Sequence, residues 1–168
     1  MILSDTDILS ALAKIRRIDL LYLLFEVNQL YITPAVHHEL EVARNRQFSF
    51  SQEILKYISA QKIAIIFLTP TENIFAQNLP LSLGAGERES IAIAYERKNI
   101  LLSNESRVAH WCHRLKIESF DLSSILRGLW IEGILTQDEV RELIAELHIH
   151  DRMSLSARTM AAIFAPKQ

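Results

Sequence analysis

Short apolar runs alternate along the chain with longer segments in which apolar residues recur at helical spacing. The apolar runs predict strands at 2–4, 30–33, 62–68, 100–102 and 116–120. The spaced segments predict helices from Asp7 to about 17, then at about 18–27, 34–44, 51–60, 71–78, 87–98, 104–115, 122–131, 136–147 and 154–164. Strands that alternate with helices through short loops predict a mainly parallel sheet covered on both faces.

Polar residues mark several of these helix ends. Thr33 caps a helix whose first residue is Pro34, a position that suits proline because its missing N–H would be unpaired there. Thr71 is expected to cap a short helix in the same way. The β-branched run 62–68 predicts a strand buried on both faces. In the helix over 87–98, Tyr95 is expected to point inward together with its apolar neighbours.

The residues between Leu122 and the end of the chain are predicted to be wholly helical. The pair Thr136 and Glu139 has the spacing of a capping box and marks the start of one of these helices. The sequence contains no internal repeat, low-complexity tract or linker. We therefore expect one domain over 1–168, with an α/β core over 1–120 and a helical C-terminal part over 121–168.

Composition describes an ordinary globular protein, with 49% hydrophobic and 23% charged residues among 168. The formal net charge of -2 gives no general attraction to nucleic acid, so phosphate binding would need a local basic patch or metal ions. Cys112 is the one cysteine, which excludes an intramolecular disulfide and agrees with a reducing compartment. Asp5 and Asp7 interrupt the N-terminal apolar segment, and the longest apolar run is too short to span a bilayer. We expect a soluble cytoplasmic protein without membrane contact.

Four acidic residues stand where apolar runs give way to helices: Asp5, Glu39, Glu87 and Glu105. The carboxyl ends of parallel strands meet at one edge of a sheet, and ligands bind at that edge in open α/β sheets. Carboxylate oxygens suit hard divalent cations, so the pattern indicates a metal site. Each acid taken alone also has an ordinary interpretation, because acidic residues are favoured at helix caps and in first helical turns.

Histidine and cysteine do not indicate a second kind of metal site. His37 and His38 are adjacent on a helix and point about 100° apart, so they cannot readily chelate one ion. His110, Cys112 and His113 are close together but have no second cluster to complete a four-ligand zinc site.

Four motifs follow one another along the chain. They are Asp5-Thr6-Asp7 after the first strand, Val36 to Leu40 with Glu39 in a Pro-initiated helix, Gly86-Glu87 before an Ala/Ile-rich helix, and Ser103-Asn104-Glu105 after a strand. Taken in this order, they resemble the PIN-domain family, and most closely its branch of VapC-type toxins and their relatives. The resemblance covers residues 1 to about 120.

The resemblance implies a three-layer α/β/α sandwich with a short, mainly parallel central sheet of about five strands. It implies a metal-dependent endoribonuclease that hydrolyses phosphodiester bonds, acting as the toxin of a toxin–antitoxin pair. One or two Mg²⁺ or Mn²⁺ ions would be held by the catalytic acids Asp5, Glu39, Glu87 and Glu105. Residues that would orient these acids or contact substrate are Thr6, Asp7, Glu89, Ser103, Asn104 and Arg107. The implied partners are RNA, a small antitoxin protein and a second copy of the chain.

One departure from the family pattern keeps an alternative open. Glu105 stands where the family usually has Asp, and the extra methylene would move the carboxylate. Family members with weakened acid sets can bind RNA or protein without cutting. A further alternative is a haloacid-dehalogenase-type phosphatase, which Asp5-Thr6-Asp7 also resembles, although Ile8 stands where that family usually has Gly or Thr.

Overall fold

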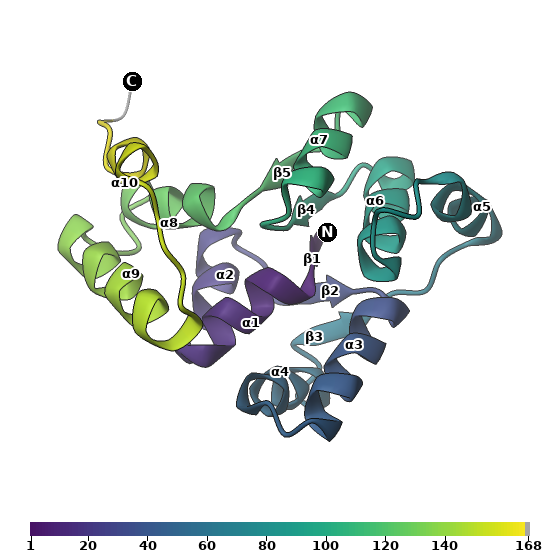
Figure 1. The fold of residues 1–168 in the computed structure, drawn as a ribbon, viewed down its shortest axis with the longest axis horizontal. Coiled ribbons are helices and arrows are strands. Elements are labelled where there is room, and N and C mark those ends of the chain that lie inside the picture. Colours follow the sequence, from purple (N-terminus) through teal and green to yellow (C-terminus); the bar gives the residue numbers. More distant parts are fainter. Residues whose placement is uncertain (167–168) are drawn as a thin grey trace.

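The computed structural model describes residues 1–166 and places a sheet of five parallel strands at the centre of the protein (Figure 1). The strands are β1 (Ile2–Ser4), β2 (Leu30–Ile32), β3 (Ile63–Ile65), β4 (Ile100–Leu102) and β5 (Ser119–Phe120). Their spatial order is β3-β2-β1-β4-β5, so the first strand lies in the middle. The predicted strands are confirmed, although β3 and β5 are shorter than the apolar runs that contain them.

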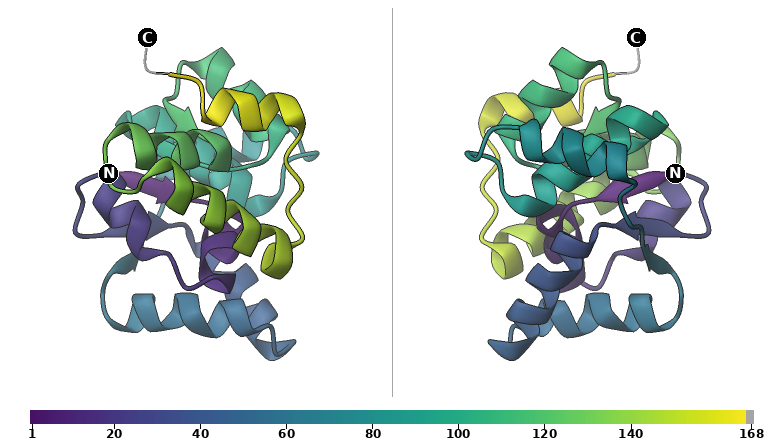
Figure 2. Two further views of the ribbon diagram at one scale, coloured as in Figure 1. Left: turned by 90° about the vertical axis from the view of Figure 1, so that its left-hand side faces the viewer. Right: turned by 90° about the vertical axis from the view of Figure 1, so that its right-hand side faces the viewer.

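Ten helices surround the sheet within the described residues. They are α1 (Thr6–Lys14), α2 (Asp19–Leu24), α3 (Pro34–Asn45), α4 (Ser49–Ser59), α5 (Pro70–Asn78), α6 (Ala85–Arg97), α7 (Ser106–Leu115), α8 (Leu122–Ile131), α9 (Gln137–Asp151) and α10 (Ala157–Ile163). Figure 2 shows α8, α9 and α10 together on one side of the molecule, while α5 and α6 lie on the opposite side. None of the helices over 1–166 is both long and apolar enough to cross a membrane.

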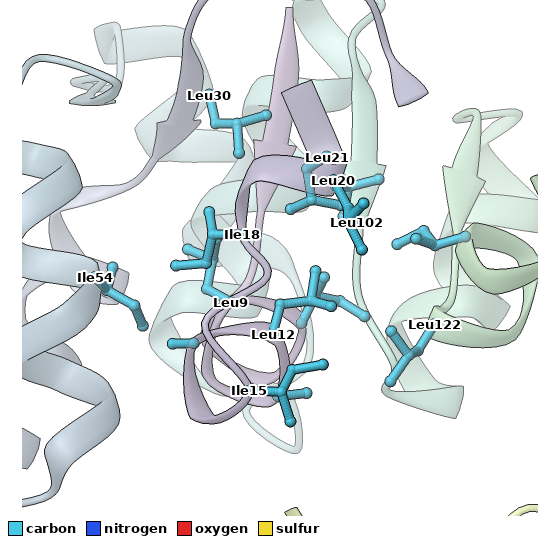
Figure 3. Packing of buried hydrophobic residues seen from close by; sticks show 14 of the residues in the cluster. Leu9, Leu12, Ile15, Ile18, Leu20, Leu21, Leu30, Ile54, Leu102 and Leu122 are labelled. Atoms are coloured by element: carbon cyan, nitrogen blue, oxygen red, sulfur yellow. The ribbon is translucent and has the colours of Figure 1, made fainter. Parts of the chain in front are cut away.

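Two hydrophobic cores lie on the two faces of the sheet. Successive residues of a strand point to opposite faces, so Ile2 belongs to one core and Leu3 to the other. The larger core packs β1, β2 and β4 against α1, α2, α8 and α9, and Figure 3 shows Leu102 and Leu122 beside residues of α1 and α2. The smaller core joins Leu3 and Leu101 to α6 and α7. This arrangement confirms the three-layer α/β/α sandwich.

Helix starts follow from local hydrogen bonding. The Thr33 side chain accepts a hydrogen bond from the Val36 N–H, and the Thr136 side chain accepts one from the Glu139 N–H. Both helices therefore begin where the sequence predicts. The expected cap at Thr71 is wrong, because Thr69 caps α5 and leaves Pro70 at the first helical position, where proline fits best.

Two expectations about burial are also wrong. The strand at 62–68 was expected to be buried on both faces, but β3 is an edge strand and the following Phe67 is 72% exposed. A continuous apolar run does not distinguish a central strand from an edge strand that continues into a loop. Tyr95 is 42% exposed and stacks on Phe75 instead of pointing inward.

Candidate functional site

The acidic residues gather at the carboxyl edge of the sheet, around the point where the chain changes direction across it. From the central strand β1 the chain continues outward to β2 and β3, then crosses back to β4 and β5 on the other side. The carboxyl ends of β1 and β4 therefore lie side by side, with Asp5 following one and Ser103 the other. Such a switch point is where open α/β sheets bind ligands.

Asp5 lies deepest in this group. It caps α1, with its Oδ1 accepting the Thr6 N–H at 2.8 Å, while the Ser103 hydroxyl is 3.4 Å from its Oδ2. The residue is 6% exposed. Burial, together with the charges of Asp7, Glu39 and Glu87, raises the pKa of Asp5 to about 7, although the hydrogen bond from the Thr6 N–H acts in the opposite direction. Asp5 is thus a carboxylate whose ionisation the fold disfavours.

Asp7 connects the two central strand ends. Its Oδ2 accepts the Asn104 N–H at 2.6 Å, and its Oδ1 accepts the Ile8 N–H at 2.6 Å. Burial raises the pKa of Asp7 to about 6, with the charges of Glu105 and Glu87 adding to the effect and the two N–H donors opposing it. The sequence analysis assigns Asp7 only a supporting role, whereas its hydrogen bond from the Asn104 N–H places it between α1 and the start of α7.

Glu39 reaches the same place from α3. The Thr6 hydroxyl donates a hydrogen bond to Glu39 Oε2 at 2.6 Å, which holds the carboxylate beside the start of α1. Gly86 lets α6 come close to it: a Cβ at this glycine would lie 2.9 Å from Val36 Cγ2 and 3.2 Å from Glu39 Oε1. Sequence reasoning missed this packing role, since the glycine before Glu87 has a negative φ and gives no turn signal.

Glu87 and Glu105 complete the group from two further helix starts. Glu87 Oε2 accepts the Gly84 N–H at 2.8 Å, closing a capping box on α6. Its charge nevertheless acts on both buried aspartates. Glu105 is the N-cap of α7, makes no capping hydrogen bond with its side chain, and has a side chain 47% exposed. Both acids are therefore positioned at the rim, above Asp5 and Asp7.

The remaining sequence candidates support or flank the acids. Glu89 Oε2 accepts the Ala35 N–H at 2.9 Å, so this carboxylate caps α3. Asn104 accepts the Leu122 N–H at its Oδ1, 3.4 Å away, which ties the edge to α8. Arg107 lies 4.0 Å from Glu105 through its Nη2 and donates from Nη1 to the Ser82 carbonyl.

The donor set fits a hard cation, but it is not assembled around one. Over residues 1–166, no group of three or more His, Cys, Asp or Glu side chains is arranged to hold a metal ion as it stands. The physical reason is that Asp7, Glu39 and Glu87 each accept protein hydrogen bonds. The five carboxylates, whose charges help to raise the pKa of Asp5 and of Asp7, provide the oxygen ligands that Mg²⁺ or Mn²⁺ prefers. In Glu39 and in Glu87 one carboxylate oxygen, Oε2, accepts the hydrogen bond, which leaves the second oxygen as a further acceptor.

Comparison with known proteins gives one family. A family model described as a PIN domain matches residues 1–166. No curated protein sequence matches the chain. The matched range includes all five carboxylates and the helices that follow the sheet, so it extends beyond the part of the chain that carries the motifs.

Proposed function

The chain belongs to the PIN-domain family, and from this premise we propose that it is a metal-dependent endoribonuclease that hydrolyses phosphodiester bonds in RNA. PIN domains are typically nucleases, and they generally bind divalent metal ions. The main support within this chain is the burial of Asp5, with a pKa of about 7, among four other carboxylates at the switch point. A cluster of this kind is costly to the fold unless a cation compensates it.

In this proposal Asp5, Glu39, Glu87 and Glu105 hold one or two Mg²⁺ or Mn²⁺ ions. Such ions supply a positioned, polarised water and offset the charge that develops on the phosphate. Asp5 is suited to the deepest ligand position because it is the most buried of the four. The other three come from separate helices at the rim, where they can adjust to the ion and remain open to RNA.

Neighbouring residues orient these acids. The Thr6 hydroxyl donates a hydrogen bond that orients the Glu39 carboxylate, and the Ser103 hydroxyl does the same for Asp5. The Asn104 N–H holds Asp7 beside both. Arg107 is 56% exposed at the same rim, where its guanidinium can meet the RNA backbone. Glu89 serves the site indirectly by capping α3.

The test is cleavage of mixed structured and single-stranded RNAs in the presence of Mn²⁺ or Mg²⁺. The parent protein is compared with Asp5→Asn and with Asp138→Asn, a matched control whose side chain is 95% exposed on α9. We expect cleavage that requires the metal, stops on chelation, disappears in Asp5→Asn and persists in Asp138→Asn. Equal rates in parent and Asp5→Asn would contradict the proposed site.

A narrower proposal concerns the biological setting. We propose that the protein is a VapC-type toxin in the cytoplasm, neutralised by a small antitoxin and forming a homodimer, in line with the family branch that its motifs resemble. Induced expression of the parent should then arrest bacterial growth, and expression of Asp5→Asn should not. Normal growth with folded, cleavage-competent parent protein would contradict the toxin role.

The non-catalytic alternative rests on Glu105. This side chain is longer than the aspartate usual in the family, is 47% exposed and lies 4.0 Å from Arg107. A protein that binds RNA equally well with and without metal, and never cuts it, would favour a binding module. Steady hydrolysis of a small phosphate monoester would favour the phosphatase alternative, which family membership makes the weaker of the two.

A further inference from the structure

A second polar feature lies next to the acidic edge, between α8 and α10. A hollow of about 350 Å³ opens there, lined by residues from the start and the middle of α8 and from both ends of α10. The two helices pack against each other, and Figure 2 shows α10 lying across α8 on the side of the molecule away from α5. The polar lining residues are Asp121, Ser123, Ser124, Arg127, Arg158 and Thr159.

The hollow begins at the end of β5, one strand beyond the β4 end that leads to Glu105 and two strands beyond the β1 end that leads to Asp5. Asp121 directly follows β5, which pairs with β4 through Leu102 and Phe120. Asn104, whose N–H holds Asp7, also accepts the Leu122 N–H at the start of α8. Neighbouring strands are roughly 5 Å apart, so the hollow lies within the reach of a short RNA strand that starts at the acids. An RNA strand that leaves the acids across the end of β5 therefore reaches this hollow.

Arg127 holds the two helices together. Its Nη1 donates to the carbonyl oxygens of Ala162, Ile163 and Ala165 at 2.9, 3.1 and 2.6 Å. Trp130 Nε1 donates to the Ile163 carbonyl at 2.7 Å. These acceptors are uncharged, so the guanidinium keeps its full positive charge while it positions α10.

Arg158 is the second cation, and it is free to bind. It is exposed and makes no hydrogen bond or ion pair within residues 1–166. The Ser123 hydroxyl is likewise unengaged there. The carboxylate of Asp121 is directed to its own helix, accepting the Ser124 N–H at 2.8 Å. Two guanidinium groups against one carboxylate make the hollow locally positive in a chain of net charge -2.

We propose that this hollow is a subsite for a backbone phosphate of the RNA, a step beyond the proposed nuclease function on which it rests. Arg158 provides the cation and the Ser123 hydroxyl provides a neutral donor, while the Thr159 hydroxyl shares a hydrogen bond of 2.8 Å with the Ser156 hydroxyl. Arg127 is a positioning residue. Guanidinium and hydroxyl groups are the usual partners of phosphate oxygens, and no aromatic ring lines the hollow to stack a base. The subsite therefore contributes affinity and direction to the strand without reading sequence.

The test is RNA binding in an uncut state. A short labelled single-stranded RNA is titrated by fluorescence anisotropy against the Asp5→Asn protein, over a series of salt concentrations. Arg158→Ala is added to this background, with Arg46→Ala as the matched control, because Arg46 is an exposed arginine at the end of α3 without an ion pair. We expect Arg158→Ala to weaken binding about fivefold to tenfold and to reduce the slope of log K against log salt by about one. Arg46→Ala should leave both values near those of the background.

A cleavage assay distinguishes a failure of the subsite proposal from a failure of the proposed nuclease function. In the parent protein, Arg158→Ala should raise KM for a longer RNA and leave the cleavage of a dinucleotide unchanged, because a dinucleotide ends before the hollow. If the parent cuts RNA while Arg158→Ala keeps the same affinity, salt slope and KM, the subsite is overturned and the nuclease function stands. If the parent neither cuts nor binds RNA, both are overturned.

Discussion

Asp5 occupies a position in which hydrogen bonding and electrostatics oppose each other. Its side chain caps α1, which stabilises the helix, yet it is 6% exposed and surrounded by other acids. Burial and like charge both favour its neutral form, so its pKa lies at about 7. A buried carboxylate of this kind lowers the stability of the metal-free fold, and its negative charge attracts a cation. Residues with such shifted pKa values are typical of functional sites.

This conflict predicts an unusual pH dependence of stability. Between the ordinary value of 3.8 and about 7, the unfolded chain releases the Asp5 proton while the folded chain retains it. The free energy of unfolding of the metal-free protein should therefore fall as pH rises through that interval, by on the order of 2–4 kcal/mol, and then level off. Asp7, with a pKa of about 6, acts in the same direction. Urea unfolding in the presence of a chelator, repeated across this pH range, measures the free energy of unfolding. A rise in that free energy over the interval would contradict the prediction.

The Asp5→Asn substitution should separate stability from function. An asparagine keeps the acceptor for the Thr6 N–H and removes the buried charge. At pH 8 without metal we expect it to raise the free energy of unfolding by about 2 kcal/mol and to flatten the pH dependence, while metal-dependent RNA cleavage is lost. Urea unfolding and a cleavage assay on the same preparation measure both. A loss of stability together with activity would mean that Asp5 is only a helix cap.

Removal of the Glu105 side chain is expected to affect activity but hardly to change stability. Its side chain is 47% exposed and makes no hydrogen bond that caps α7, so its removal should change stability by less than about 0.5 kcal/mol. If it is a metal ligand, Glu105→Ala should lower the cleavage rate by about a hundredfold or more. Glu118→Ala, at an exposed acid before β5, is the control and should retain activity. Unchanged cleavage in Glu105→Ala would remove this residue from the metal-holding set.

At the scale of the elements, the site depends on how closely α6 approaches α3. Gly86 has no side chain to separate the two helices, and Glu89 of α6 caps the first turn of α3 through the Ala35 N–H. Both contacts bring the start of α6, with Glu87, to the place where Glu39 leaves α3. The positions of these two acids are thus decided by helix packing and not by the strands.

Gly86→Ala should therefore disturb both fold and activity. The added Cβ would lie 2.9 Å from Val36 Cγ2, so α6 must move away from α3. We expect a loss of about 1–3 kcal/mol in the free energy of unfolding and a clear fall in the cleavage rate. Gly84→Ala is the matched control, since its nearest new contact is 3.8 Å away and its φ is -62. Equal effects of both substitutions, in urea unfolding and RNA cleavage, would contradict a packing role specific to Gly86.

At the scale of the whole molecule, the proposed ligands come from four parts of the chain that meet only in the folded state. Asp5 follows the central strand β1, and Glu105 follows β4. Glu39 lies on α3 between β2 and β3, and Glu87 lies on α6 between β3 and β4. A cation that binds all of them would link segments a hundred residues apart. We propose that residues 1–168 unfold as one domain, so this link should stabilise the entire fold.

Metal ions should accordingly raise the melting temperature. For an ion at a hundred times its dissociation constant we expect about 2.7 kcal/mol of stabilisation, or a shift of several degrees, within a single thermal transition. Differential scanning calorimetry with and without Mn²⁺ measures this shift. Asp5→Asn should remove most of the shift, and Asp138→Asn should keep it. Two separate transitions, of which only one responds to the ion, would contradict the one-domain proposal.

Much of the fold could be predicted from the sequence because its signals are local. The strands around Leu3 and Leu101 and the caps at Thr33 and Thr136 follow from apolar runs and from side-chain hydrogen bonds within a few residues. Burial was predicted less well. Phe67 lies in the loop after β3 and Tyr95 lies on an exposed face of α6, and the apolar pattern of a single segment does not reveal which elements pack against it.

The sequence by itself determined the parallel α/β architecture and the acids at the ends of its apolar runs. Both follow from residue type and spacing, and the order of the acidic motifs indicated the family. Only the tertiary structure decided how these acids are used: it buried Asp5, bonded Asp7 to Asn104, and turned Glu89 to the cap of α3. It also formed the hollow that contains Arg158 beside the acidic edge. The physical reason is that burial, charge coupling and close helix approach depend on distances between segments remote in the chain, which local sequence patterns do not specify.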